Sequence, residues 1–304
     1  MEQSGFYEQL CGILSKEQVL CREPMSRHTT FRVGGPADYY VMPQPEQAAQ
    51  VVALCRREQV PCQIVGNGSN LLVGDGGVRG VVLAFAKQAA HIQINGSRLK
   101  AGAGALLSQI AAAACRAGLG GLEFAAGIPG SVGGAVVMNA GAYGGECRDV
   151  LTQAAVLTEE GERLILTKQE LDLSYRHSCI PERRLIVLEA EFLLQPGQRE
   201  NIQALMDDLK HRRLEKQPLE YPSAGSTFKR PEGYFAGKLI MEAGLAGYTS
   251  GGAQVSEKHC GFVINTGNAT AKDIRTLIRH VQEKVLEHSG VCLQPEVKFM
   301  GEFL

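Results

Sequence analysis

The sequence predicts a protein of mixed α and β structure, divided into two or three domains. Its length of 304 residues exceeds what a single hydrophobic core usually supports. Over residues 1–85, strand-like segments alternate with a helix-like one, which indicates a small α/β unit. Towards the other end, residues 271–288 carry apolar side chains at helical spacing. A glycine-rich run, 120–146, separates these two regions.

The elements before residue 88 follow from apolar spacing and from turn residues. In order, we expect short helical pieces over 1–25 that end near Glu23–Pro24, strands over 37–42, 64–65 and 78–85, and a helix over 45–58 between the first two strands. The helix prediction depends on Ala48, Val51 and Cys55, which fall on one face. Pro45 suits its first turn.

After residue 88, hairpins and longer helices are expected. In order, these are a hairpin about Asn95–Gly96, a helix over 105–117, a hairpin about Glu160–Gly161, a strand over 185–194, helices over 201–216 and 271–288, and a strand over 291–299. The helix over 271–288 is the best defined of them, because Thr270 can cap its start and Gly290 its end.

Charge and cysteine spacing exclude several classes of protein. The formal net charge is −1, so we expect no nucleic-acid partner. The nine cysteines include no pair at C-x-x-C spacing, which favours free thiols in a reducing compartment and no metal site. The amino-terminal segment has no basic start, and no apolar run approaches about 18 residues. We therefore expect a cytoplasmic protein that does not act at a membrane.

The glycine-rich run from Gly120 to Glu146 indicates backbone that approaches a ligand. We expect it not to be helical, because each interior glycine costs roughly 1 kcal/mol relative to alanine. Apolar side chains such as Leu122 and Val136 make it too hydrophobic for a flexible linker. Main-chain N–H groups that lie close together can bind the phosphates of a large cofactor.

A second glycine-rich segment, Gly66–Asn70, follows the strand expected at 64–65. It can present consecutive N–H groups of the kind that bind pyrophosphate, although a plain turn has the same composition. Two such segments suit the two ends of a dinucleotide. A Rossmann site is excluded, because Gly102-Ala103-Gly104 is followed by Leu107 where a third glycine is needed, and no Walker A loop occurs.

Three polar side chains are candidates for chemistry. Arg176 lies in the cluster Tyr175–Ser178 and can bind a carboxylate or a phosphate with its planar guanidinium. Ser226 lies in a loop where its hydroxyl can face a cavity. Glu296 lies in an apolar strand, where burial would raise the pKa of its carboxyl group and make it an acid. Taken singly, each is more often an ordinary surface or loop residue.

Seven motifs occur in order along nearly the whole chain. They are Thr29–Ala37, Gly66–Leu72, Gly127–Gly134, Asn139–Gly144, Tyr175-Arg176-x-Ser178, Gly225-Ser226-x-Phe228 and Pro295–Val297. Together they resemble the UDP-N-acetylenolpyruvoylglucosamine reductase family. The resemblance implies an α+β fold class, with a vanillyl-alcohol-oxidase-type FAD-binding fold of two α/β subdomains and a C-terminal α+β substrate domain. The implied ranges are 1–87 for the first FAD-binding subdomain, joined by a C-terminal strand at 293–304, then 88–200 for the second, and 201–292 for the substrate-binding domain.

The resemblance also implies an activity. This is the NADPH-dependent, FAD-mediated reduction of UDP-N-acetylglucosamine enolpyruvate to UDP-N-acetylmuramate, a step of peptidoglycan precursor synthesis for the cell wall. The implied cofactors are FAD and NADPH, and the implied partner is a small sugar-nucleotide substrate. The oligomeric state stays open, with a monomer favoured.

The functional positions of the family are carried over by motif. The catalytic positions are Arg176, Ser226 and Glu296. Substrate contacts are expected for Tyr175, Lys229 and Lys238, and one of Lys216, Lys229 and Lys238 is expected to assist Ser226. The cofactor positions are Gly66, Asn67, Gly68, Ser69, Asn70, Leu71, Gly127, Ile128, Pro129, Gly130, Ser131, Gly133 and Gly134.

The chain departs from the common family pattern in two places. Arg230 stands where an asparagine is usual, and Gln294 stands where a first glutamate is usual. The short interval between Tyr175-Arg176 and Ser226 resembles the compact form of the family, which lacks an inserted tyrosine-bearing loop. Two alternatives are another FAD-dependent oxidase or dehydrogenase of the same fold and a non-catalytic nucleotide-binding module.

Overall fold

The computed structural model describes residues 3–304, which form two compact units. The first unit contains the residues up to Cys21, Tyr39–Asn67 and Gly80–Arg212, and the second contains Arg22–Asp38, Gly68–Arg79 and Arg213–Leu304. Each unit has a hydrophobic core of its own. The boundaries derived from the sequence, at residues 87, 200 and 292, stay predictions.

A four-stranded sheet contains the strands in which the chain passes between the units. Its strands are β1 (Val19–Pro24), β2 (Pro36–Val41), β3 (Cys62–Val65) and β5 (Val78–Ala84), in the order β1-β2-β5-β3. The helices of this part of the chain are α1 (Gln3–Ile13) and α2 (Pro45–Arg57), with short 3-10 turns at Lys16–Gln18 and Met25–Arg27. Helix α1 packs against α2, which has Pro45 at its start and buries Ala48, Val51 and Cys55 as predicted.

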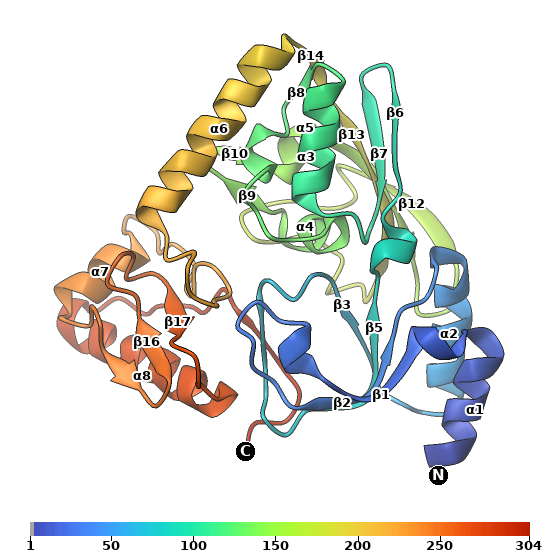
Figure 1. Cartoon of the computed structure of the whole chain (residues 1–304), viewed down its shortest axis with the longest axis horizontal. Coiled ribbons are helices and arrows are strands. Elements are labelled where there is room, and N and C mark those ends of the chain that lie inside the picture. Colours follow the sequence, from blue (N-terminus) through green and yellow to red (C-terminus); the bar gives the residue numbers. More distant parts are fainter. Residues whose placement is uncertain (1–2) are drawn as a thin grey trace. The chain divides into compact units, whose positions relative to one another are not determined.

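The first unit also contains a five-stranded antiparallel sheet (Figure 1). Its strands are β6 (Ile92–Asn95), β7 (Arg98–Gly102), β11 (Leu151–Leu157), β12 (Arg163–Thr167) and β13 (Ile186–Leu193), in the order β12-β11-β13-β7-β6. The two predicted hairpins are confirmed, with Gly96 and Gly161 at positive φ in their turns. Helix α3 (Leu107–Arg116) contacts β6 and β7, and α4 (Val132–Met138) contacts β7 and β13.

Short elements complete the first unit. They are 3-10 turns at Lys87–Ala89 and Glu123–Ala125, the strand pair β8 (Leu119–Gly120) and β14 (Gln195–Pro196), the pair β9 (Gly141–Ala142) and β10 (Gly145–Glu146), and helix α5 (Cys147–Val150). Helix α6 (Arg199–Lys216) then carries the chain into the second unit. None of the helices within residues 3–304 combines the length and apolarity needed to cross a membrane.

Helix α4 corrects the expectation that the glycine-rich run is not helical. Ser131 caps this helix by accepting a hydrogen bond from the N–H of Gly134 at 3.5 Å. Gly133 packs tightly on the sheet, because a Cβ there would lie 3.0 Å from the Cβ of Ala103. The buried side chains of Val132 and Val136 stabilise the helix through tertiary packing, which outweighs the intrinsic cost of glycine.

The second unit is built around one long helix. Its elements are α7 (Ala236–Glu242), the antiparallel strands β15 (Thr249–Ser250), β16 (Ala253–Val255) and β17 (Val263–Asn265), α8 (Ala271–Ser289), and the parallel pair β4 (Leu71–Val73) and β18 (Lys298–Met300). Helix α8 has the predicted boundaries: Thr270 forms a capping box with Asp273, and Gly290 ends the helix at φ +70°. Its apolar stripe packs against β15, β16 and β17.

Two other expectations were wrong about local structure. Residues 19–24 form strand β1 rather than helix, because pairing with β2 satisfies their backbone. The strand expected over 291–299 is regular only at β18. Before it, the chain buries Leu293 and Val297 in the second core while Pro295 forms an isolated bridge with Phe228.

Candidate active site

The first candidate region is the loop that precedes α4, residues 127–131. The side-chain amide of Asn67 donates a hydrogen bond of 2.6 Å to the carbonyl of Pro129, which ties the loop to the turn after β3. Gly66 lies in the same turn, and a Cβ there would approach the Ser131 hydroxyl to 2.5 Å. The two glycine-rich segments are therefore in contact through Gly66, Asn67, Pro129 and Ser131.

Several N–H groups of these segments are available to an anion. Within residues 3–304, the N–H groups of Gly127, Gly130 and Ser131 donate no hydrogen bond, and the same holds for Asn67, Gly68 and Ser69. Gly68 lies at φ +64°, and a Cβ there would overlap the carbonyl of His28. Consecutive N–H groups with a residue in the left-handed region form a concavity that binds phosphate. This chemistry fits the pyrophosphate of FAD.

The second region is the tight turn that carries Arg176. Ser174 and His177 exchange backbone hydrogen bonds of 3.3 and 3.1 Å, and Arg176 lies between them at φ +55°, in the left-handed region that non-glycine residues rarely adopt. The Arg176 guanidinium donates to the carbonyl of Gly141 at 3.1 Å and lies 5.1 Å from the ring centre of Tyr175. The turn is anchored to α4 by the Ser178 hydroxyl, which donates to the carbonyl of Val137 at 2.8 Å.

A buried thiol interacts electrostatically with Arg176. Cys147 is fully buried, and burial raises the pKa of its thiol to about 12, against the opposing pull of the Arg176 charge. The thiol is therefore neutral at physiological pH. Because it does not become a thiolate, the Cys147 side chain adds no negative charge beside Arg176.

The third region, in the second unit, contains Ser226 and Glu296. Phe228 and Pro295 form an antiparallel bridge, the N–H of Glu296 donates to the carbonyl of Thr227 at 2.8 Å, and the N–H of Lys229 donates to the carbonyl of Gln294 at 2.9 Å. Segments 227–229 and 294–296 therefore run side by side. Ser226 is exposed next to this pair and Glu296 is half-buried within it. The structure thus brings together two residues that are far apart in the sequence.

Thr227 fixes the backbone beside Ser226. Its side chain is fully buried, its N–H donates to the carbonyl of Gly261 at 2.8 Å, and its hydroxyl accepts a hydrogen bond from the N–H of Val263 at 2.9 Å. His259 accepts from the N–H of Gly261 at 3.1 Å, and burial lowers the pKa of its imidazole. These contacts join the Ser226 loop to residues 261–263, in addition to its hydrogen bonds with residues 294–296.

Asn70 has a role that the sequence did not indicate. Its side-chain amide donates to the carbonyl of Glu296 at 3.0 Å, and its own carbonyl accepts from the N–H of Lys298 at 2.9 Å. Asn70 therefore braces the backbone that carries Glu296. Its assignment to the cofactor stays a prediction, as does that of Leu71, which begins β4.

The three candidate lysines differ in their surroundings. Lys238, on α7, is exposed and pairs with Glu242 one helical turn away at 3.7 Å. Lys216 is exposed at the end of α6. Lys229 is half-buried, and its backbone belongs to the segment paired with 294–296. Of the three, only Lys229 lies in the segment that follows Ser226 and pairs with the segment that contains Glu296.

Arg230, which departs from the family pattern, stacks on an aromatic ring. Its guanidinium lies 4.0 Å from the ring centre of Phe235, and its Nε donates to the carbonyl of Tyr234 at 3.3 Å. A cation over an aromatic face is attracted by the negative potential of the ring. Arg230 is therefore held by these two contacts, which an asparagine would not reproduce.

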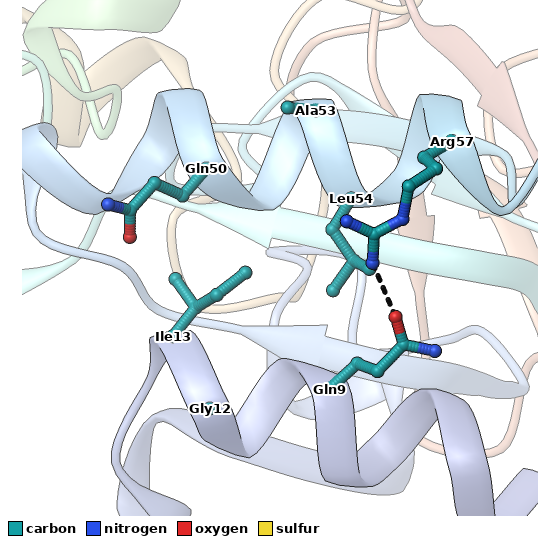
Figure 2. A pocket seen from close by; sticks show the side chains of 7 residues that line it. All are labelled: Gln9, Gly12, Ile13, Gln50, Ala53, Leu54 and Arg57. Atoms are coloured by element: carbon teal, nitrogen blue, oxygen red, sulfur yellow. Dashed lines mark hydrogen bonds between the residues drawn. The ribbon is translucent and has the colours of Figure 1, made fainter.

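One surface depression is lined by none of the predicted site residues. It has a volume of about 470 Å³, lies along α1 and α2, and is lined by Gln9, Gly12, Ile13, Gln50, Ala53, Leu54 and Arg57 (Figure 2). A hydrogen bond of 2.5 Å from Arg57 to Gln9 crosses it. Among the described residues, no group of three or more His, Cys, Asp or Glu side chains is arranged to hold a metal ion.

Comparison with known families identifies the class of protein to which this chain belongs. Residues 37–167 match the family described as FAD binding domain, and residues 217–300 match UDP-N-acetylenolpyruvoylglucosamine reductase, C-terminal domain. A solved structure titled alkyldihydroxyacetonephosphate synthase shares the fold alone, at 16% identity and a TM-score of 0.50, over 63% of this chain and 40% of that chain. The chain is an FAD-dependent oxidoreductase, and the α+β fold class with a vanillyl-alcohol-oxidase-type FAD-binding domain is confirmed.

Full-length similarities narrow the class to one family. The UDP-N-acetylenolpyruvoylglucosamine reductase of Agathobacter rectalis is 58% identical over 92% of this chain and 93% of its own, and that of Lachnoclostridium phytofermentans is 54% identical over 97% of both. The crystal structure of the reductase from Thermus caldophilus superposes with a TM-score of 0.80 at 37% identity, over 91% of this chain and 97% of that one. The chain belongs to the UDP-N-acetylenolpyruvoylglucosamine reductase family.

Proposed function

We propose that this chain reduces UDP-N-acetylenolpyruvoylglucosamine to UDP-N-acetylmuramate with NADPH as the reductant, and that Arg176, Ser226 and Glu296 act on the substrate. Membership of the family supports the proposed reaction, and the positions of the motifs support the assignment of the three residues. The structural observation that supports the residue assignment is the pairing of segment 227–229 with 294–296, which holds Ser226 and Glu296 on neighbouring backbones. The product is a precursor of peptidoglycan, and the proposed location is the cytoplasm.

The cofactor is held by main-chain donors. The N–H groups of Gly127, Gly130 and Ser131, with those of Asn67 to Ser69, are the donors that would bind its phosphates. Bound FAD supplies a hydride carrier between NADPH and the substrate. Gly66 and Gly133 also allow close packing on Ser131 and Ala103.

Arg176 provides positive charge where the reaction builds up negative charge. An enol ether is electron-rich and accepts hydride at C3 only if charge on its conjugated carboxylate and C2 is stabilised. The Arg176 guanidinium keeps its charge beside a neutral Cys147 thiol, and a preorganised donor of this kind is typically worth roughly 3–4 kcal/mol. We assign the substrate carboxylate to Arg176 and, as a second hydrogen-bond donor, to a protonated Glu296.

Ser226 donates the proton that completes the reduction at C2. Its hydroxyl is exposed next to a rigid backbone, as a group that must reach a substrate requires. A serine hydroxyl is a weak acid, so the resulting alkoxide needs a nearby cation. Lys229 is the proposed cation, because it lies three residues further along the same segment and is half-buried. Tyr175 and Lys238, both exposed, are the remaining proposed contacts to the sugar nucleotide.

The test is a two-part assay on the purified protein. The protein should be yellow, and it should oxidise NADPH at a rate that depends on added UDP-N-acetylenolpyruvoylglucosamine. A protein whose flavin is reduced by an alcohol or a different sugar, and which ignores the enolpyruvyl compound, would be another flavoenzyme of the same fold. A colourless protein that cannot be loaded with FAD would overturn the proposal.

A further inference from the structure

We infer that Asn139 is a positioning residue that holds Arg176 in its working orientation; this inference rests on the proposed role of Arg176. Asn139 ends helix α4, directly after the proposed cofactor loop and its helix. It is fully buried and lies at φ +42°, in the left-handed region. A buried polar side chain in an uncommon backbone conformation is held there by the structure around it.

The Asn139 side chain makes three hydrogen bonds to segments beside Arg176. Its Nδ2 donates to the carbonyl of Ser174 at 3.0 Å and to a carboxylate oxygen of Glu146 at 2.9 Å, and its Oδ1 accepts from the N–H of Arg148 at 2.9 Å. Ser174 is the first residue of the tight turn that places Arg176 at φ +55°. Asn139 therefore fixes the start of this turn.

The other end of the Arg176 side chain is held by the same network. Its guanidinium donates to the carbonyl of Gly141, which lies two residues after Asn139 and pairs with Glu146 across β9 and β10. A Cβ at Gly141 would approach the Cβ of Glu146 to 2.6 Å, so the two strands are as close as glycine allows. The Asn139 amide therefore fixes the backbone of Arg176 through Ser174. Through Glu146, it also fixes the position of Gly141, whose carbonyl accepts from the Arg176 guanidinium.

The experiment removes the Asn139 side chain without straining the backbone. Asn139→Gly keeps the left-handed conformation, since glycine adopts it freely. We expect the rate of the half-reaction that consumes the enolpyruvyl substrate to fall roughly 100-fold, the loss typical of a misplaced catalytic group. Bleaching of the flavin by NADPH and the FAD content should stay within about twofold of the parent protein, because the cofactor loop is untouched.

A matched control is available in the same unit. The side chain of Gln47 also makes three hydrogen bonds, to Ile13, Gln18 and Gln44. Gln47→Ala should lower the melting temperature but leave both half-reactions within about twofold. If Gln47→Ala slowed the substrate half-reaction as much as Asn139→Gly does, the effect would be general destabilisation and the inference would be wrong.

The decisive readout is coupling to Arg176. In an Arg176→Ala background, which should itself lose the substrate half-reaction, Asn139→Gly should add less than about twofold, because there is no side chain left to position. An equal loss in both backgrounds overturns the inference, as does an Asn139→Gly protein with the parent rate while Arg176→Ala is inactive. If Arg176→Ala keeps the parent rate, the proposed function of Arg176 fails first, and the inference fails with it.

A second variant is available if Asn139→Gly does not fold. Asn139→Asp tolerates the same φ and removes the donor to Ser174, and it is judged by the same criteria.

Discussion

Arg176 and Ser226 are both presented by loops, but the two loops are held in different ways. Arg176 is held mainly by side chains, namely the buried amide of Asn139 and the hydroxyl of Ser178. These contacts stabilise a turn in which Arg176 itself lies at positive φ. Ser226 depends mostly on backbone, through the hydrogen bonds that join 227–229 to 294–296 and Thr227 to Gly261. Orientation at Arg176 is therefore sensitive to point substitutions, whereas the Ser226 region should tolerate them unless they touch the hydroxyl itself.

The largest expected effect is on Ser226→Ala. Loss of the proposed general acid should slow the substrate half-reaction by about 10²–10⁴-fold, while flavin reduction by NADPH stays nearly unchanged. Rapid mixing of NADPH-treated enzyme with substrate measures the first rate, and mixing with NADPH alone measures the second. Ser223→Ala, in the same loop, is the matched control and should keep both rates. A parallel fall of both half-reactions in Ser226→Ala would give this residue a structural role instead.

The next effect tests the side-chain-held region through Arg176→Lys. Lysine keeps the charge but loses the planar fork and the fixed hydrogen bond to Gly141, so we expect the substrate half-reaction to slow by roughly 10²–10³-fold. Arg184→Lys is a suitable control, because Arg184 also lies at positive φ but is exposed and pairs with Glu159. Near-parent activity in Arg176→Lys would mean that charge alone suffices there.

The contrast between the regions also shows what a sequence can and cannot predict. Helix α8 was predicted from its apolar stripe and caps, and the hairpins at Gly96 and Gly161 from their turn residues, because these signals are local. Helix α4 was missed because its stability comes from Val132 and Val136 packing against distant residues, which glycine content conceals. Strand β1 was missed for the same reason, since its partner lies further along the chain.

The sequence predicts a site residue when a motif assigns it a role. It does not predict a residue whose role is to support another residue. Arg176, Ser226 and Glu296 were selected from motifs, and the closeness of segments 227–229 and 294–296 is a product of the fold. Asn139 was part of a quoted motif without a role, because its burial and its three hydrogen bonds depend on Ser174, Glu146 and Arg148 meeting in space. The brace from Asn70 to Glu296 joins residues that no local pattern connects.

A smaller effect, on stability, tests the backbone-held region. Thr227→Val removes the buried hydroxyl that accepts from the N–H of Val263, and an unsatisfied buried donor costs about 1–3 kcal/mol. Denaturant unfolding should show this loss of free energy, while the substrate half-reaction of the folded protein changes little. Thr158→Val, which removes hydroxyl contacts in the hairpin turn after β11, is the control and should cost less. A Thr227→Val protein of parent stability would show that the backbone bonds to Gly261 and Glu296 are sufficient.

The last prediction concerns how stability depends on pH through the Cys147 thiol, which lies beside Arg176. The pKa of Cys147 is raised from its ordinary value of 9.0 to about 12 in the folded protein, chiefly by burial. Between these values the unfolded chain loses the thiol proton and the folded chain keeps it, so the folded state binds more protons and its stability falls as pH rises. The slope from this group is at most about 1.4 kcal/mol per pH unit; it is about half of that at pH 9.0 and small by about pH 8. Unfolding free energies measured from pH 8 to pH 11 should therefore decline less steeply in Cys147→Ala than in the parent, and equal slopes would show that the thiol ionises as readily in the folded protein as in the unfolded one.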